Sequence, residues 1–475
     1  MPEQHLGISQ QTLVSNNGDQ ALSAKKWPQY TASLASTLGA LAAGMVLAWS
    51  SSAGDKGIEL QKVYGVPVSE EEFSWIGSIS TLGAGAICIP IGILADFIGR
   101  KTSMLLMVVF FSVGWLLIIF ADSVAMFCIG RFITGLSSGA FCVAAPMYAA
   151  EIAEKEIRGT LGAFFQLLLT VGILLSYILG NYVDIRELSI ISAVVPLIFF
   201  AIFVFMPESP IYYLKKGDED SARKSLIRLR GAHYDADGEL QAHKNAMEED
   251  SKNMAPFWTV AKSRATIKAF IIAYGLMLFQ QLSGVNAVIF YTSSIFGKAG
   301  SSLSSGSSTM IVGAMQVVAA FVSSLVVDRA GRKILLLVSI IFMCLSSCTL
   351  GVYFYLDDHA ERATVDSITW LPLVSVCVFI IMFNMGFGPV PWTMVGELFA
   401  PEVKSVVAGS ACLFNWLLAF IVTKFFSNLS TGMGLGPTFW LFSGICLIGC
   451  AFVGILVPET KGKSLEQIQR ELNGL

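Results

Sequence analysis

Three amide side chains interrupt an otherwise apolar stretch of the chain, at Gln280, Gln281 and Asn286. Amides donate and accept hydrogen bonds without carrying charge, so they suit a ligand that offers hydroxyl groups. Ser283-Gly284 lies between them and predicts an unwound turn, which lets amides on different helix faces point inward. The triplet therefore predicts a site for a neutral, hydroxyl-rich ligand. The alternative for any single amide is a hydrogen bond that joins two helices.

Catalytic chemistry finds little support elsewhere in the sequence. The four histidines (5, 233, 243 and 359) fall in polar segments, and the nine cysteines all fall in apolar stretches, where small packing residues are expected. The pairs Cys344/Cys348 and Cys446/Cys450 share helix faces but have no nearby histidine or carboxylate to complete a zinc site. We find no nucleophile–base pair and no phosphate-binding loop. The sequence thus predicts no enzyme, no metal and no cofactor.

The elements that position these amides must lie in a membrane. The 475 residues are 54% hydrophobic and 14% charged, against about 25% charged in soluble domains. The apolar residues form blocks of about 20, the length of a bilayer-spanning helix. The predicted spans are 30–50, 73–95, 103–121, 125–149, 160–182, 188–206, 266–290, 308–327, 334–356, 370–393, 405–427 and 437–456. A net charge of -3 excludes a basic footprint for nucleic acid.

Loop composition predicts the domain organisation and the orientation. We expect a tail (1–29), a six-helix bundle (30–206), a polar helical linker (207–265), a second six-helix bundle (266–456) and a second tail (457–475). An even number of spans puts both tails on one side, which then holds 24 of the 31 Lys and Arg, against six opposite. The positive-inside rule therefore predicts cytoplasmic termini.

The two halves repeat each other in register. Asp96-Phe-Ile-Gly-Arg-Lys101 follows span 2, and Asp328-Arg-Ala-Gly-Arg-Lys333 follows span 8. Further pairs follow spans 4 and 10 (Glu151/Arg158 and Glu397/Lys404) and spans 6 and 12 (Pro207-Glu-Ser-Pro and Pro458-Glu-Thr-Lys). The offsets are 232, 246 and 251 residues, in the same order. Three matches in register indicate an internal duplication of six-helix units.

The repeated charges predict two clusters at the cytoplasmic face. One comprises Arg100, Glu151 and Arg158, and the other Arg332, Glu397 and Lys404. Arginine bridges carboxylates bidentately, so we expect the clusters to latch the halves together when the path opens outward. The alternative is that these charges anchor loops to lipid headgroups. Arg131, inside span 4, is expected to pair with polar groups of its own half.

Six motifs in order resemble the sugar porter family of the major facilitator superfamily. They are Gly130-Arg-Phe-Ile-Thr-Gly135, Pro207-Glu-Ser-Pro210, Gln280-Gln-Leu-Ser-Gly-Val-Asn286, Asp328-Arg-Ala-Gly-Arg332, Gly388-Pro-Val-Pro-Trp392 and Pro458-Glu-Thr-Lys-Gly462. The resemblance covers nearly the whole chain and is greatest to facilitative glucose transporters, on the branch of the insect trehalose transporters. It implies an all-α membrane protein with twelve transmembrane helices in two bundles around a central path.

The resemblance also assigns roles to residues. It places Gln280, Gln281 and Asn286 on the sugar hydroxyls and Tyr291 at the outer gate. The other cavity-lining residues that it implies are Gln166, Gln316, Asn384, Trp392, Asn415 and Trp416. Independently of the resemblance, Gly386, Gly388, Pro389 and Pro391 break span 10 and predict the hinge of a moving gate. The chain departs from the glucose-transporter pattern at Asn384, Gln316 and Ala419, and Ala419 leaves room for a disaccharide such as trehalose.

The expected function is facilitated diffusion of a hexose or disaccharide by alternating access. The spans hold no carboxylate deep in the membrane, and span 1 lacks the aspartate of proton-coupled sugar porters. The alternatives are a sugar-sensing transceptor with little flux and a proton-coupled sugar or polyol symporter. We expect a monomer in the lipid bilayer of the plasma membrane, with a small sugar as its partner.

Overall fold

The computed structural model describes residues 24–53, 57–154, 156–253, 256–300 and 303–474, and every regular element in them is an α-helix. Twelve helical spans are long and apolar enough to cross a membrane. Only helices and closed barrels satisfy their backbone hydrogen bonds in lipid, and this chain uses helices. The prediction of an all-α membrane protein with twelve spans is confirmed.

The first six spans form the N-terminal half. They are α1 (Trp27–Ser52), α3 (Glu70–Ile98), α4 (Arg100–Ile119), α5 (Val124–Ile152), α6 (Arg158–Tyr182) and α7 (Ile185–Phe203). The last six form the C-terminal half: α12 with α13 (Arg264–Leu282, Val285–Ala299), α14 (Ser305–Ala330), α15 (Arg332–His359), α17 with α18 (Leu371–Met385, Val390–Leu398), α19 (Pro401–Gly432) and α20 (Leu435–Leu456).

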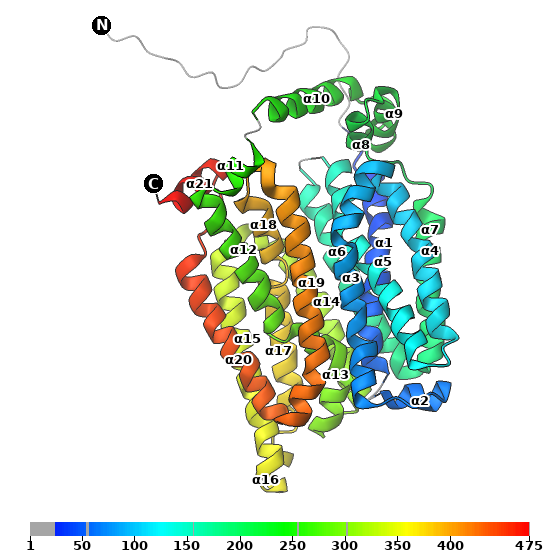
Figure 1. Cartoon of the computed structure of the whole chain (residues 1–475), viewed down its shortest axis with the longest axis vertical. Coiled ribbons are helices and arrows are strands. Elements are labelled where there is room, and N and C mark those ends of the chain that lie inside the picture. The colour runs from blue at the N-terminus through cyan, green and yellow to red at the C-terminus, as the bar shows by residue number, and fades with distance from the viewer. Residues whose placement is uncertain (1–23, 54–56, 155, 254–255, 301–302, 475) are drawn as a thin grey trace.

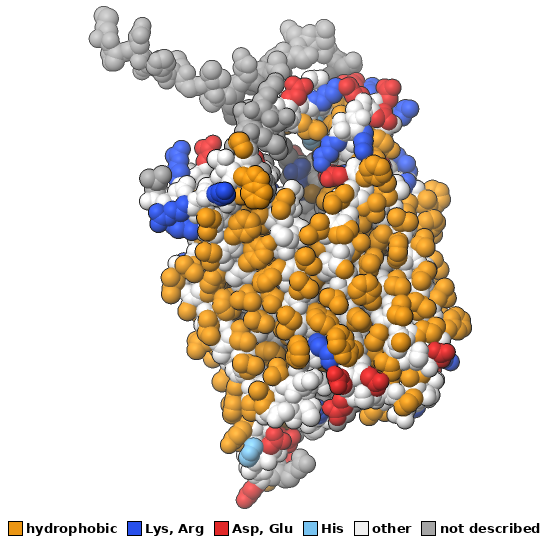
Figure 2. Space-filling model, viewed as in Figure 1, with side chains coloured by type: hydrophobic (Ala, Val, Ile, Leu, Met, Phe, Trp, Pro, Cys, Tyr) orange, Lys and Arg blue, Asp and Glu red, His pale blue; other side chains and the backbone are white. Residues whose placement is uncertain are grey.

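Short helices distinguish the two ends of the molecule (Figure 1). One end, called here the linker end, carries α8 (Pro210–Lys215), α9 (Glu219–Arg230), α10 (Ala236–Asn253), α11 (Phe257–Ala261) and α21 (Leu465–Asn473). The other, called the loop end, carries α2 (Ile58–Tyr64) and α16 (Arg362–Asp366). Figure 2 shows hydrophobic side chains along the flank and charged ones mainly at the two ends, as expected for a protein surrounded by lipid.

Small residues bring the helices of the N-terminal half into close contact. A Cβ at Gly135 in α5 would lie 2.0 Å from the Ser80 carbonyl oxygen of α3, and one at Gly44 in α1 would lie 2.1 Å from the Leu169 oxygen of α6. Since lipid gives no hydrophobic drive for helix association, such close backbone packing holds membrane helices together.

Arg131 of α5 is fully buried and pairs within its own half, as predicted. Its guanidinium donates to the carbonyl oxygens of Val46 (2.7 Å), Ile76 (3.2 Å) and Gly77 (3.3 Å) and to the Ser80 hydroxyl (3.1 Å). These acceptors belong to α1 and α3, so one cation joins three helices of the half. Each bond replaces water that the guanidinium lost on burial.

The linker segment is helical over most of 231–251, where a solvated linker without helix was the alternative. Helix α10 covers most of the stretch 231–251 and is held to α9 by an ion pair of Arg230 with Glu239 at 3.0 Å. Burial alone would raise the pKa of Glu239, but hydrogen bonds from His243 and Arg230 and the charge of Arg230 outweigh it and hold that pKa at about 2. The pair therefore stabilises the packing of α10 at neutral pH.

Candidate functional site

A helix break in the seventh span positions the amide triplet. Helix α12 ends at Leu282, Gly284 adopts φ +89°, and α13 begins at Val285. An L side chain would be strained there, and a Cβ would also lie 2.6 Å from the Phe442 ring. The unwound turn predicted from Ser283-Gly284 is therefore present, with Gln280 and Gln281 before it and Asn286 after it.

The amides bond to one another in a continuous relay. Asn286 Nδ2 donates to Gln281 Oε1 (2.5 Å), Gln281 Nε2 donates to Asn415 Oδ1 (2.8 Å), and Asn415 Nδ2 donates to Gln280 Oε1 (2.6 Å). Gln280 Nε2 completes the chain by donating to the carbonyl oxygens of Phe387 (2.6 Å) and Gly388 (3.0 Å). All four amides are buried. The structure thus brings together four uncharged amide side chains from two spans.

The relay ends on the second helix break. Helix α17 ends at Met385 and α18 begins at Val390, so the carbonyls of Phe387 and Gly388 lie in irregular backbone. Irregular backbone at membrane depth persists only where it is buried in protein or lines a cavity. The predicted break of span 10 is present, with Gly388 and Pro389 within it and Pro391 in the first turn of α18. Its carbonyl groups are occupied by Gln280.

The remaining predicted polar residues fall into two groups. Gln166 of α6 and Asn384 of α17 face each other across the two halves, with Gln166 Nε2 at 3.5 Å from Asn384 Oδ1. Asn384 also donates to the Ile380 carbonyl oxygen at 2.9 Å. Gln316 of α14 is buried, and its Oε1 atom has no hydrogen-bond partner. A buried acceptor left unpaired costs about 1–3 kcal/mol, and Gln316 Oε1 is the one fully buried side-chain amide oxygen without a partner among the described residues.

A cavity of about 630 Å³ lies between the halves at the linker end. Its walls come from α3 and α5 on one side and α18 and α19 on the other, and it extends from Asp96 and Lys404 to Cys88, Cys142 and Cys412. Among the predicted sugar-site residues, Trp392 lines it and the relay amides do not. Cys88 and Cys412 lie 3.0 Å apart, sulfur to sulfur, across the two halves.

The halves are joined by hydrogen bonds at the loop end. Tyr177 of α6 donates its hydroxyl to the Ile289 carbonyl oxygen of α13 at 2.7 Å, and the Ser293 N–H donates to the Ser51 hydroxyl of α1 at 3.1 Å. Residues 289 and 293 would bond to each other in a regular helix. Here Tyr291 between them is non-helical (φ -120°, ψ 19°), so the kink offers main-chain groups to the other half.

Aromatic and charged side chains complete this closure. The Tyr291 hydroxyl donates to the Thr423 carbonyl oxygen (3.1 Å), and its ring packs on Phe73 of the N-terminal half. Lys424 is buried inside α19, where its Nζ donates to the Ser74 hydroxyl (2.7 Å) and lies 4.7 Å from the centroid of the Trp75 ring. The two halves are therefore in contact at the loop end, and the cavity of about 630 Å³ lies between them at the linker end.

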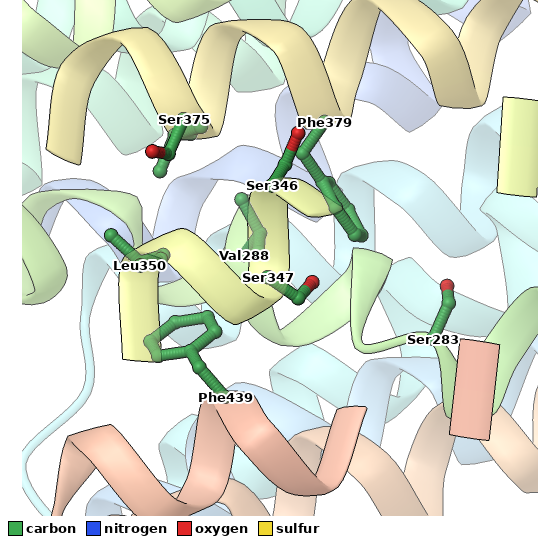
Figure 3. Close-up of a pocket in the computed structure, with 9 residues that line it drawn as sticks. Ser283, Val288, Ser346, Ser347, Leu350, Ser375, Phe379 and Phe439 are labelled. Atoms are coloured by element: carbon green, nitrogen blue, oxygen red, sulfur yellow. The ribbon is translucent and has the colours of Figure 1, made fainter. Parts of the chain in front are cut away.

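Trp416 lies where the two halves are close. Its Cβ would be 3.2 Å from a Cβ at Gly85 of α3. A second cavity, behind the α12–α13 break, is much smaller, with about 10 Å³, and is lined by serines 283, 346, 347 and 375 and by Val288, Leu350, Phe379 and Phe439 (Figure 3). A volume of this size holds about one water molecule, so it cannot hold a sugar.

The two charge clusters are near copies of each other. Arg100 pairs with Glu151 at 2.9 Å and Arg332 with Glu397 at 3.0 Å. In the first cluster Ser209 donates to Glu151, and in the second Thr460 donates to Glu397 at 2.6 Å. These matched contacts bear out the duplication inferred from the sequence. Arg158 and Lys404 are exposed and form no ion pair with the clusters among the described residues.

The carboxylates that follow each half cap the helix after the repeated turn. Glu208 accepts the main-chain N–H groups of Arg100 and Lys101, and Glu459 accepts those of Arg332 and Lys333. Burial raises the pKa of Glu208 above its usual value, against these bonds. At the less buried Glu459, burial also raises the pKa, but the main-chain donors outweigh it and hold the pKa below its usual value.

Sequence reasoning missed three features of the site. Lys424 was counted among the charges outside the membrane, whereas it is buried within α19. Tyr177 and the Cys88–Cys412 contact carried no local signal, because each depends on which helices of opposite halves adjoin. The one available indication was that Lys424 falls inside the predicted span 405–427 and not in the loop after it.

This fold and site are those of a membrane transport protein. A family model described as "Sugar (and other) transporter" matches residues 15–472, and the chain belongs to that family. It is 38% identical to the facilitated trehalose transporter Tret1 of Culex quinquefasciatus, over 94% of this chain and 86% of the relative. It is also 38% identical to Tret1 of Aedes aegypti, over 94% of this chain, which spans about half (55%) of that relative's length.

Solved structures show the same fold. The xylose transporter XylE from E. coli, in a partially occluded inward-open conformation, aligns with a TM-score of 0.76 at 23% identity, over 92% of this chain and 99% of XylE. The proton:xylose symporter XylE bound to 6-bromo-6-deoxy-D-glucose aligns with a TM-score of 0.75, over 94% of this chain. The family is one of transporters, in agreement with the expectation that the chain is not an enzyme.

Proposed function

We propose that the chain is a facilitative sugar transporter that moves a neutral hexose or disaccharide, such as glucose or trehalose, across a membrane by alternating access. The observation that carries the proposal is the relay of Gln280, Gln281, Asn286 and Asn415, anchored on both helix breaks. Sugar hydroxyls can replace each relay bond one for one, since both partners donate and accept. Binding would therefore loosen the link between the relay and the hinge backbone of span 10.

The contacts at the two ends support alternating access. In the state described here, Tyr177, Ser51 and Lys424 each bond across the halves at the loop end. Outward opening requires these bonds to break while the cavity of about 630 Å³ closes. In that state Arg158 and Lys404, now exposed, would join the Glu151 and Glu397 clusters of the opposite half as a latch. Trp392 and Trp416 would then bracket the sugar.

The spans lack the carboxylates and histidines that commonly carry the proton in coupled transporters. Between their ends the twelve spans carry the cations Arg131 and Lys424 but no carboxylate and no histidine. Arginine does not titrate in the physiological range. We therefore propose uniport. The similarity to facilitated trehalose transporters supports trehalose as the first sugar to test, and the small side chain of Ala419, four residues after Asn415 in α19, would leave room for a second ring.

Counterflow in proteoliposomes tests the function. Purified protein should exchange labelled trehalose or glucose in phosphatidylcholine vesicles, with a rate unchanged by a pH gradient at clamped zero voltage. Gln281→Ala should reduce exchange at least tenfold, because about 1–3 kcal/mol is lost for each partner left unpaired. Gln469→Ala is the matched control, since its amide bonds the Leu398 carbonyl oxygen at the linker end (2.6 Å). Equal exchange rates for both variants would contradict the assigned sugar site. Faster exchange under a proton gradient would contradict uniport.

The charge distribution supports an orientation with both termini in the cytoplasm, and we propose a monomer in the plasma membrane. The sequence segments assigned to the side of the tails contain 24 of the 31 Lys and Arg. An epitope placed at residue 475 should bind antibody only after the cells are permeabilised. Antibody binding to intact cells would contradict the proposed orientation.

A further inference from the structure

A cavity of about 660 Å³ lies at the linker end of the N-terminal half, outside the sugar path. Its walls are the ends of α3, α4 and α7 together with α8 and α9, which Figure 1 shows above the ends of those spans. One side is apolar, with Ile98, Leu105 and Val204, and the other carries Lys101, Lys224 and Arg228. Ligand cavities range from about 300 to 1,000 Å³, so the volume suits a molecule larger than a simple ion.

The three cations have no carboxylate partner within the described residues. Lys101 Nζ donates to the Val204 carbonyl oxygen at 2.7 Å, and Arg228 donates to that of Phe205. Glu208 also lines the cavity, but its carboxylate is taken by the main-chain N–H groups of Arg100 (3.1 Å), Lys101 (3.0 Å) and Ser209 (2.8 Å). The lining therefore carries three cations against the single carboxylate of Glu208, and its balance of charge is positive.

The second half shows that helix capping does not require this cavity. Lys333, the repeat counterpart of Lys101, donates to the Gly454 carbonyl oxygen at 2.9 Å, and Glu459 caps α15 as Glu208 caps α4. Lys224 and Arg228 come from α9, which follows the N-terminal half. In the second half the described segment after Glu459 leads to α21, where Gln469 bonds the Leu398 carbonyl oxygen at the end of α18. The basic wall is thus an addition to the shared framework.

We infer that this cavity binds an anionic phospholipid, with the headgroup phosphate between Lys101, Lys224 and Arg228 and an acyl chain along Ile98 and Leu105. Helix α4 begins at Arg100 and α7 ends at Phe203, so the cations lie at the ends of the spans, where lipid headgroups lie. In the orientation proposed above, on which this one step rests, the leaflet is the cytoplasmic one, which carries the anionic lipids.

Lipid binding can be measured apart from sugar transport. Full-length protein in phosphatidylcholine nanodiscs is titrated with dioleoyl phosphatidic acid, and bound lipid is counted by native mass spectrometry alongside Tm. We expect a retained lipid and a raised Tm. Lys224→Gln should weaken binding about fivefold, and Lys224→Gln with Arg228→Gln about 30-fold. Arg223→Gln is the control, because Arg223 is on the same helix but pairs outward with Asp237 at 2.8 Å.

The arms separate the possible sources of the phosphate. Glycerol 3-phosphate, the same headgroup without acyl chains, is added to protein in phosphatidylcholine alone and should leave Tm unchanged. An equal rise in Tm with glycerol 3-phosphate would replace the lipid with a soluble phosphate. Equal lipid retention by the wild type, the Arg223→Gln variant and the double variant would overturn the site. Lys224 is exposed and makes no bond to the described residues, so its variant should fold normally.

Discussion

Removal of one hydroxyl group should shift the balance between the two open states. Tyr177 donates its hydroxyl to the Ile289 carbonyl oxygen across the halves at 2.7 Å, in the state that is closed at the loop end. Tyr177→Phe removes this bond together with the longer contact of the same hydroxyl to Thr292 Oγ1 at 3.3 Å. A buried neutral hydrogen bond contributes about 1 kcal/mol, which is about a fivefold change in the equilibrium constant. If the Ile289 oxygen stays dry and unpaired, the cost rises to about 3 kcal/mol, or about 160-fold.

The populations can be read from distances across the loop end. Spin labels at Tyr182 and Met433, both exposed on opposite halves there, report opening by double electron–electron resonance in a background without reactive cysteines. We expect the outward-open fraction to rise with Tyr177→Phe. Tyr148→Phe is the control, because Tyr148 donates to the Pro207 carbonyl oxygen at the same 2.7 Å but within one half. It should lower Tm without changing the populations. Equal effects of both variants, or none with Tyr177→Phe, would refute the reasoning.

Three further outcomes follow from contacts described above. The pKa of Glu239 is held at about 2, so its stabilisation of α10 is complete above the usual glutamate pKa and is lost as the pH falls toward 2. Hydrogen exchange in α10 should therefore become faster in acid, and Glu239→Gln should make it faster already at pH 7. Gly135→Ala places a Cβ 2.0 Å from the Ser80 oxygen and should lower Tm by overpacking, at a cost of about 1–3 kcal/mol or more, whereas Gly162→Ala meets open space and should not; equal Tm values would contradict the packing. Copper phenanthroline should oxidise Cys88 and Cys412, 3.0 Å apart, to a disulfide that stops sugar exchange until dithiothreitol is added, and a Cys88→Ala variant should keep its exchange rate.

The local structural features of this molecule could be predicted from its sequence. Twelve apolar blocks predicted the spans, because the thickness of the bilayer sets their length. Ser283-Gly284 and the stretch from Gly386 to Pro391 predicted the two breaks, since glycine and proline act on their own backbone. A buried arginine needs hydrogen-bond acceptors nearby, so Arg131 was expected to bond to polar groups of its own half, as it does.

The contacts between distant helices were beyond sequence reasoning. The relay partner of Gln281 is Asn415, in another span, and the resemblance named both residues without predicting that they bond. Lys424 looked like a boundary charge because nothing in its neighbours along the chain shows that Ser74 and Trp75 lie beside it. The open end of the path was also unpredictable, since the same residues must form both the inward and the outward states.

The bonds of Arg131 and the two helix breaks make the halves mechanically unequal. Arg131 joins α1, α3 and α5, while both interrupted spans belong to the C-terminal half. One of them carries three of the relay amides, and the other accepts the last bonds of the relay. A chimera that takes its first six spans from a relative should therefore keep the substrate preference of this chain. The reciprocal exchange should transfer that preference, because the relay amides and the helix break to which they bond both belong to the C-terminal half.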